Sequence, residues 1–208
     1  MFTGIIEDLA RVGAVRTSPG RRRFLIEADC VRQVAAGDSL ALNGVCLTAE
    51  AGDRRERGVW VSAVEETLRR TTAGSWRRGR RLHLERALAA DGRFGGHIVQ
   101  GHVDGLGRVM RIGREGREFI LSVLVPPDLR RYVVSKGSLA VDGISLTVGR
   151  LQGGLARLYI IPETLERSLV SEYRTGDRVN LEVDLVAKYV ESMQQARSRA
   201  TDRGRMNP

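Results

Sequence analysis

The chain has 208 residues, of which 42% are hydrophobic and 28% are charged. This balance is typical of a globular protein, and no apolar run approaches the roughly 20 residues that a membrane-spanning helix needs. Two cysteines are too few for a disulfide framework, and the start Met-Phe-Thr-Gly does not resemble a signal peptide. We therefore expect a cytoplasmic protein without a membrane partner.

A net charge of +9 raises the question of a nucleic-acid partner. Runs of arginine at 21–23, 54–55 and 77–78 spread the excess charge over several loops. Aromatic residues make up 5% of the chain, and none interleave with these runs as a base-stacking platform requires. We therefore expect a solvated, arginine-rich surface and no nucleic-acid partner.

Alternation of apolar and polar residues predicts six short strands in the first half of the chain. They cover residues 11–15, 23–28, 39–42, 46–49, 59–64 and 81–85. Short helices are expected at 29–36, with Asp29 as the N-terminal cap, and at 65–71. Asn43-Gly44 lies between two strands and indicates a tight hairpin turn.

The second half of the chain repeats the first. Residues 1–12 align with 98–109, and three further blocks recur in the same order at nearly the same spacing. A period near 97 residues is far longer than the roughly 20 to 50 residues of a solenoid repeat. Each copy is therefore expected to be a small domain with its own core. The second copy predicts a helix from Glu163 and strands at 118–125, 138–141, 145–150, 155–160 and 178–183.

About six short, evenly spaced strands in the first copy, and the same plan in the second, favour small antiparallel barrels, because closure leaves no exposed edge. The predicted fold class is all-β, with barrels at 1–97 and 98–185 and short helices between strands. Beyond residue 185 an apolar stripe at helical spacing predicts a terminal helix within 186–208 that docks or oligomerises. The stripe consists of Val186, Tyr189, Val190 and Met193. The tail from about Arg197 is expected to be disordered.

The sequence has no phosphate loop, no metal-ligand spacing and no serine–histidine elbow, so the candidate site is dispersed along the chain. The two copies differ where His102 aligns with Ile5 and where Cys46 aligns with Ser145. His102 follows a glycine and precedes a strand, which predicts a place at the mouth of the second barrel. The alternative for His102 is a surface histidine in a turn, and the alternative for Cys46 is a buried structural cysteine. Cys30 aligns with an apolar position, and we assign it to packing.

Two further polar residues stand out. Lys136 is one of only two lysines among 34 basic residues, which indicates a local need for a compact ammonium group, with chance as the alternative. Asp184 ends the last predicted strand beside the terminal helix, where a helix cap is an equally weighted alternative.

Several of these segments together resemble riboflavin synthase of the alpha-chain type. They are residues 1–6, 43–48, 96–105, 136–138, 142–147 and 161–167. The resemblance covers roughly residues 1–192. It implies two six-stranded Greek-key barrels and a C-terminal helix, assembled as a homotrimer. It also implies a dismutation of two 6,7-dimethyl-8-ribityllumazine molecules, in which a four-carbon unit passes from one to the other. The products are riboflavin and 5-amino-6-ribitylaminouracil.

The resemblance implies that no metal and no cofactor take part, and that two lumazines share each site. It further implies the lumazine synthase of the same pathway as a protein partner. The alternative is a non-catalytic lumazine- or flavin-binding relative with the same barrels. Both copies keep the Gly-x-x-Leu-Thr and Glu-Thr-Leu motifs, which favours the enzyme.

The resemblance implies a catalytic set of His102, Ser145, Thr147, Cys46, Asp184 and Lys136. Ser39 is a further candidate in the first barrel. The implied ligand contacts are Gly4, Ile5, Ile6, Cys46, Leu47, Thr48, Ser62, Ala63, Val64, Glu65, Glu66, Thr67, Gly101, His102, Val103, Lys136, Ser145, Leu146, Thr147, Ile160, Ile161, Pro162, Glu163, Thr164 and Leu165. Which group removes the C7 methyl proton, and which barrel holds the donor, stay open.

The linker Gly95-Gly96-His97 runs almost directly into the second copy. Such a tether spans roughly 10 Å when extended. We therefore expect that the two barrel mouths do not meet within one chain, and that each substrate pair lies between subunits.

Overall fold

A computed structural model of the chain describes residues 1–51 and 58–205, with side chains described up to Gln195. These residues form two closed antiparallel barrels. The first barrel contains β1 (Asp8–Ser18), β2 (Arg21–Glu27), β3 (Ser39–Leu42), β4 (Val45–Glu50), β5 (Val59–Val64) and β6 (Arg81–Arg86). The second contains β7 (Gly105–Glu115), β8 (Glu118–Leu124), β9 (Ser138–Val141), β10 (Ile144–Gln152), β11 (Leu155–Ile160) and β12 (Arg178–Val183).

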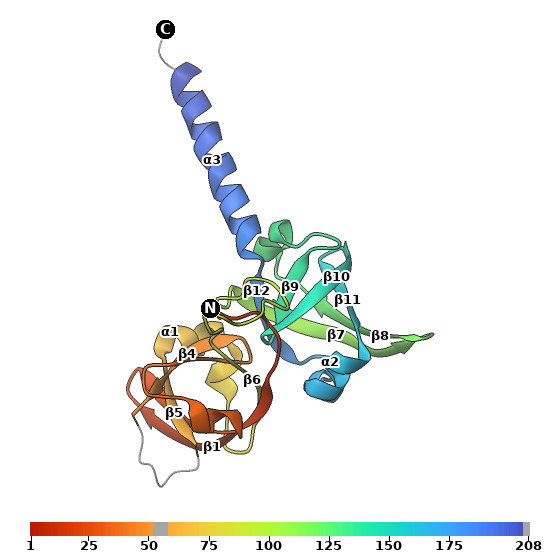
Figure 1. The fold of residues 1–208 in the computed structure, drawn as a ribbon. Helices are drawn as coiled ribbons and strands as arrows, with labels where there is room; N and C mark the ends of the chain where they lie inside the picture. The colour runs from red at the N-terminus through yellow and green to blue at the C-terminus, as the bar shows by residue number, and fades with distance from the viewer. Residues whose placement is uncertain (52–57, 206–208) are drawn as a thin grey trace.

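The two barrels have the same strand order. The first closes as β1-β2-β5-β4-β3-β6, and the second follows the same circuit with β7 in the place of β1. Figure 1 shows the barrels side by side, with the first in red to yellow and the second in green to blue. The predicted fold class, two tandem six-stranded barrels, is therefore confirmed.

Local sequence explains the hairpin that joins β3 to β4. Asn43 and Gly44 both have positive φ, at 44° and 72°, which is the backbone that a two-residue hairpin turn requires. The turn sets the register in which Ala41 pairs with Cys46. It therefore places Cys46 near the start of β4.

The short helices lie between strands. They are α1 (Glu65–Arg70), α2 (Pro162–Arg167) and the 3-10 helices η1 (Cys30–Gln33), η2 (Thr72–Ser75), η3 (Pro127–Tyr132) and η4 (Val170–Glu172). The expected helix at 29–36 is wrong, because only η1 forms and Asp29 makes no side-chain cap bond. Asp38 accepts a hydrogen bond from the backbone N of Ala35, which draws this segment into a turn.

The terminal helix α3 (Leu185–Arg205) projects away from the second barrel in Figure 1. It ends at Arg205, and residues 206–208 lie outside the described residues. The disorder expected from about Arg197 stays a prediction. The sequence supplies no glycine or proline between Leu185 and Arg203, which suits a continuous helix.

Each barrel encloses its own apolar core. In the first barrel the fully buried Phe24 and Trp76 rings meet edge to face, with centroids 5.2 Å apart. In the second, Leu121, Leu139 and Leu158 are fully buried. The tandem repeat thus folds as two units of similar construction.

Buried polar contacts fix one barrel against the other. Nδ2 of Asn180 donates to the carbonyl of Asn43 at 2.7 Å, and Oδ1 of Asn180 accepts from the backbone N of Thr72 at 2.8 Å. The counterpart contact joins the backbone N of Leu169 to Nε2 of His83 at 2.8 Å. Since Nε2 accepts, the proton of His83 lies on Nδ1, and burial lowers the pKa of His83 to about 4. The two halves therefore meet through a neutral, nearly twofold network.

Candidate functional site

Two extended segments cross between the barrels. We call residues 1–6 the first arm and residues 98–103 the second arm. At the crossing the backbone of Phe2 exchanges two hydrogen bonds with Val99, of 2.7 and 3.1 Å. Both side chains are fully buried, so the arms are locked together at the centre of the molecule.

The second arm lies on the first barrel. The carbonyl of Gly101 accepts from the backbone N of Cys46 at 2.9 Å, and Val103 packs against the first core. His102 lies between these two contacts and is exposed. The expectation that His102 lies at the mouth of the second barrel is therefore wrong, because its own arm crosses to the other barrel.

The first arm lies on the second barrel in the same way. The carbonyl of Gly4 accepts from the backbone N of Ser145 at 2.8 Å, and Ile6 belongs to the second core. Ile5 lies between them with 49% of its surface exposed. Each barrel thus carries a short segment of the opposite repeat beside the strand that follows its hairpin turn.

Glycine is required at both crossing contacts. Gly4 and Gly101 each have φ near +77°, a conformation that other residues rarely adopt. A Cβ on Gly101 would lie 2.5 Å from Cβ of Cys46, and one on Gly4 would lie 2.7 Å from Cβ of Ser145. The arms therefore press directly on the two strands.

The first barrel presents a thiol at this place. Cys46 is half-buried, and burial raises the pKa of its thiol, although the Ser39 hydroxyl acts in the opposite direction. The group is therefore a protonated thiol at neutral pH, suited to donating a hydrogen bond more than to nucleophilic attack.

The second barrel presents a hydroxyl held by a histidine. Oγ of Ser145 lies 2.7 Å from Nδ1 of His97, whose side chain is buried. Burial lowers the pKa of His97, while the charge of Asp184 raises it. Nε2 of His97 is buried and has no hydrogen-bond partner among the described residues. A neutral imidazole therefore orients the Ser145 hydroxyl.

His97 was not among the residues predicted for the site. It precedes the second arm directly, and its counterpart in the first copy would precede Met1, so the alignment of repeats has no partner for it. Its place within segment 96–105, one of the segments that carry the resemblance, was the signal in the sequence.

Asp184 and Lys136 hold special backbone positions. Oδ1 of Asp184 accepts from the backbone N of Val186 at 2.9 Å, so the carboxylate caps α3 as well as acting on His97. Lys136 has φ of +68°, where the first copy has Gly37 at +97°. A non-glycine residue in this region costs roughly 1 kcal/mol, which makes the retained lysine a functional candidate.

The other predicted contacts separate by exposure. Exposed side chains are Thr48, Val64, Glu65, Glu66, Thr147, Ile161, Pro162 and Glu163. Half-buried ones are Ser62, Thr67, Thr164 and Leu165, while Leu47, Ala63, Leu146 and Ile160 are buried. The buried group faces the cores, so only its backbone is available to a ligand.

Several of the predicted polar groups are already engaged. Ser62 accepts from Nε of Arg21 at 2.7 Å, and Glu66 is paired with arginines of its own helix. Val64 and Ile161, by contrast, are 57% and 61% exposed at the N-terminal caps of α1 and α2. These two matched apolar side chains are the available contacts for a flat ring.

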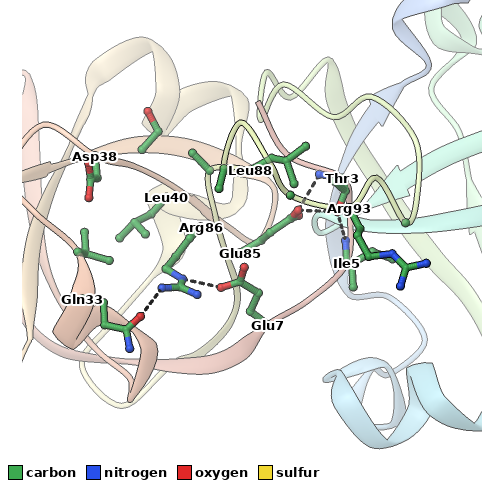
Figure 2. A pocket seen from close by; sticks show the side chains of 16 residues that line it. Thr3, Ile5, Glu7, Gln33, Asp38, Leu40, Glu85, Arg86, Leu88 and Arg93 are labelled. Carbon is green, nitrogen blue, oxygen red and sulfur yellow. Dashed lines mark hydrogen bonds and ion pairs between the residues drawn. The ribbon is translucent and has the colours of Figure 1, made fainter.

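A cavity of about 570 Å³ lies between the first barrel, the first arm and the linker (Figure 2). It brings together Ser39 and Ile5 of the predicted set. Its wall also contains Arg86, which donates to Glu7 at 2.7 Å and to Gln33 at 2.9 Å. The remaining lining residues are Thr3, Val34, Asp38, Leu40, Glu85, Ala87, Leu88, Ala89, Gly92, Arg93 and Gly95.

Within residues 1–51 and 58–195, no group of three histidine, cysteine, aspartate or glutamate side chains gathers as metal ligands would. In the same part of the chain, no helix has the length and apolarity needed to cross a membrane.

Comparison with known proteins places these elements in a family. The model of the lumazine binding domain matches residues 3–87 and again 100–184. Riboflavin synthase of Mycobacterium tuberculosis (strain ATCC 25618 / H37Rv) is 43% identical over 198 residues, covering 93% of this chain and 98% of the relative. Riboflavin synthase of Actinobacillus pleuropneumoniae is 40% identical over 192 residues, covering 92% and 88%.

The fold is also that of solved structures. LumP complexed with 6,7-dimethyl-8-(1'-D-ribityl) lumazine superposes with a TM-score of 0.78 at 19% identity, over 88% of this chain and 99% of LumP. LumP complexed with riboflavin gives a TM-score of 0.79 at 20% identity and the same coverage. The two matched domains and the identity to whole synthases lead to one conclusion: the chain belongs to the riboflavin synthase family.

Proposed function

We propose that this chain catalyses the dismutation of two 6,7-dimethyl-8-ribityllumazine molecules to riboflavin and 5-amino-6-ribitylaminouracil. The observation that carries the proposal is the pair of matched cradles, each made by an arm glycine lying on the strand after a hairpin turn. Two equivalent cradles suit a reaction whose two substrates are identical. Identity of about 40% to whole riboflavin synthases supports the same reaction.

The reaction requires little beyond proton transfer and the alignment of two lumazine rings. The C7 methyl protons of the lumazine are acidic because the ring delocalises the carbanion, so a base near neutral pH suffices. His102 beside the first cradle, and Ser145 with His97 beside the second, are the proposed proton-transfer groups. Cys46 is proposed to polarise a ring by donating a hydrogen bond, and Thr147, Asp184 and Lys136 are proposed to polarise the rings or add to the acceptor. Holding the two rings face to face contributes the rest of the rate acceleration through proximity.

The two cradles lie on different barrels, so the facing rings are proposed to come from two subunits of a homotrimer. The helix α3 is anchored to its own barrel by Lys188, whose Nζ lies 2.7 Å from Asp104, and by Glu191, which contacts Tyr132 and Arg131. These polar contacts occupy one side of the helix. Its apolar side is therefore free for neighbouring chains.

That apolar side is strongly exposed. Val186, Tyr189 and Met193 expose 58%, 63% and 63% of their surface, and Val190 exposes 48%. Burial of these groups would contribute several kcal/mol at about 25 cal/mol per Å². The double variant Tyr189→Lys, Met193→Glu should sediment as one chain, keep riboflavin binding and lose most turnover. Ser192→Lys on the same helix is the control. A fully active monomer would contradict the intersubunit site.

The second candidate function is non-catalytic binding of lumazine or flavin, since the LumP complexes with both ligands share the fold. The two candidates separate in one assay. Purified protein is mixed with the lumazine alone, and riboflavin is measured by its fluorescence and by chromatography. Appearance of riboflavin supports the enzyme, whereas bound but unchanged lumazine supports the carrier.

Two further parts complete the proposal. We propose a cytoplasmic location, as expected from the composition, and association with lumazine synthase, which the resemblance implies. Co-sedimentation of the two purified proteins tests the association, and independent sedimentation of each would contradict it.

A further inference from the structure

A buried carboxylate of the second barrel holds the arm that serves the first. Glu182 in β12 is 4% exposed. Its Oε1 accepts from the backbone N of Gln100 at 2.7 Å and its Oε2 from that of Gly101 at 2.9 Å. The carbonyl of Gly101 then accepts from the backbone N of Cys46 in β4. A continuous chain of hydrogen bonds therefore runs from one barrel, through the arm, to the other.

The same arrangement occurs with the roles of the two barrels exchanged. Glu85 in β6 of the first barrel, also 4% exposed, accepts from the backbone N of Thr3 at 2.6 Å and from that of Gly4 at 2.9 Å. Figure 2 shows the Glu85 carboxylate beside Thr3 in the wall of the cavity. The carbonyl of Gly4 continues the chain to the backbone N of Ser145 in the second barrel. Two occurrences at matched positions exclude an accidental contact.

The carboxylate is the group that these arms require. Two adjacent backbone N–H groups need two acceptors, and an amide of the same size supplies one acceptor and one donor. Keeping a carboxylate in this place is costly, since burial raises the pKa of Glu182 to about 7 and raises that of Glu85 as well. The buried carboxylates fix the two arms in place. In this position His102 and Ile5 are exposed over the opposite barrels.

We propose that Glu182 and Glu85 are positioning residues that each set the ligand affinity of the opposite barrel. Glu182 fixes the cradle around Cys46, and Glu85 fixes the cradle around Ser145. The inference rests on the proposed function, because it assumes that these cradles bind the lumazine and flavin rings. A glutamate that merely stabilised its own barrel would not produce crossed effects.

The test uses the full chain and its isosteric variants Glu182→Gln and Glu85→Gln, which serve as controls for each other. Glu172→Gln removes an exposed carboxylate paired with Arg81 and serves as the surface control. Riboflavin is the probe. Hydrogen exchange, followed by mass spectrometry over a riboflavin titration, reads the peptide around Cys46 and the peptide around Ser145 separately.

Glu182→Gln should weaken riboflavin protection of the Cys46 peptide by about tenfold, because one backbone donor is left unpaired, with less than about twofold change at the Ser145 peptide. Glu85→Gln should give the reverse pattern. In turnover, both variants should raise KM more than they lower kcat, because both remove ground-state positioning. Glu172→Gln should match the unmodified chain.

An uncrossed pattern, equal losses at both peptides, or no loss at either would overturn the inference. Failure of the proposed function gives a different result: the unmodified chain protects both peptides with riboflavin but forms none from lumazine, and the crossed pattern still stands. An unmodified chain that binds no riboflavin at either peptide overturns both.

Discussion

The first and second barrels share one strand circuit and one arm contact, but they present different groups to the space beside the arm. The first offers the Cys46 thiol and the second offers Ser145 held by His97. The first has Gly37 where the second has Lys136 in the same left-handed conformation. Duplication has thus kept the backbone cradle and changed its chemistry. In the proposed reaction, this difference is what lets one lumazine donate and the other accept.

The largest effect should follow from breaking one cradle. Gly101→Ala places a Cβ 2.8 Å from the backbone N of Cys46 and displaces the second arm. Because a misplacement of about 1 Å costs catalysis roughly a hundredfold, kcat/KM should fall by about that factor or more. Gly116→Ala is the matched control, with φ of +60° and no atom within 4 Å of the new Cβ. Comparable activity of the two variants would show that the arm contact does not matter.

Removal of the histidine should make the two barrels more alike. His97→Ala frees the hydroxyl of Ser145, and kcat should fall by about a hundredfold, the lower end of the range for groups that assist proton transfer. If His97 acts through Ser145, the double variant with Ser145→Ala should be no slower than the slower single variant. Steady-state kinetics measure kcat of the single and double variants. If the loss in the double variant equals the product of the two single losses, a shared role is contradicted.

The hairpin turns offer a test of stability. Asp142 is fully buried, and burial raises its pKa to about 7, whereas the first copy has Asn43 at this place. A raised carboxyl pKa gives stability that is present below the unfolded pKa near 4 and is lost as pH rises toward 7. Asp142→Asn should remove this loss, gaining on the order of 4 kcal/mol relative to the parent between pH 4 and 8, at about 1.4 kcal/mol per pKa unit.

The Asn side chain fits the same partners, since Oδ1 can accept from the backbone N of Asn180 and Nδ2 can donate to the Tyr173 hydroxyl. Urea unfolding of both proteins across this pH range measures the difference. Parallel curves for parent and variant would contradict the assignment.

The smallest effect concerns the strained lysine. Lys136→Gly installs the residue of the first copy, relieving about 1 kcal/mol of backbone strain while adding similar freedom to the unfolded chain. Thermal unfolding should therefore hardly change, whereas kcat/KM should fall by about tenfold through loss of the ammonium group. Full activity of the variant would show that the lysine at this position occurs by chance.

Local patterns in the sequence predicted most of the fold. Alternation predicted the strands, Asn43-Gly44 predicted the hairpin, and the repeat predicted a second barrel. The segment 29–36 failed because a helix of about two turns has little intrinsic stability, and Asp38 stabilises a turn there instead.

The crossing of the arms is a different kind of failure. Residues 1–6 and 98–103 are copies of each other, so either arm suits either barrel, and local pattern cannot choose between them. Long-range contacts decide, through the exchange between Phe2 and Val99 and the anchoring glutamates. His102 was therefore assigned to the wrong barrel, and His97, which has no counterpart in the repeat, was missed.

The stoichiometry of turnover tests the two-barrel account most directly. Purified protein is given the lumazine in the presence of a chelator, and lumazine, riboflavin and the pyrimidine product are all quantified at intervals. The account predicts that two lumazines disappear for each riboflavin and each pyrimidine formed, at an undiminished rate. Formation of one riboflavin per lumazine, or of riboflavin without the pyrimidine, would contradict it.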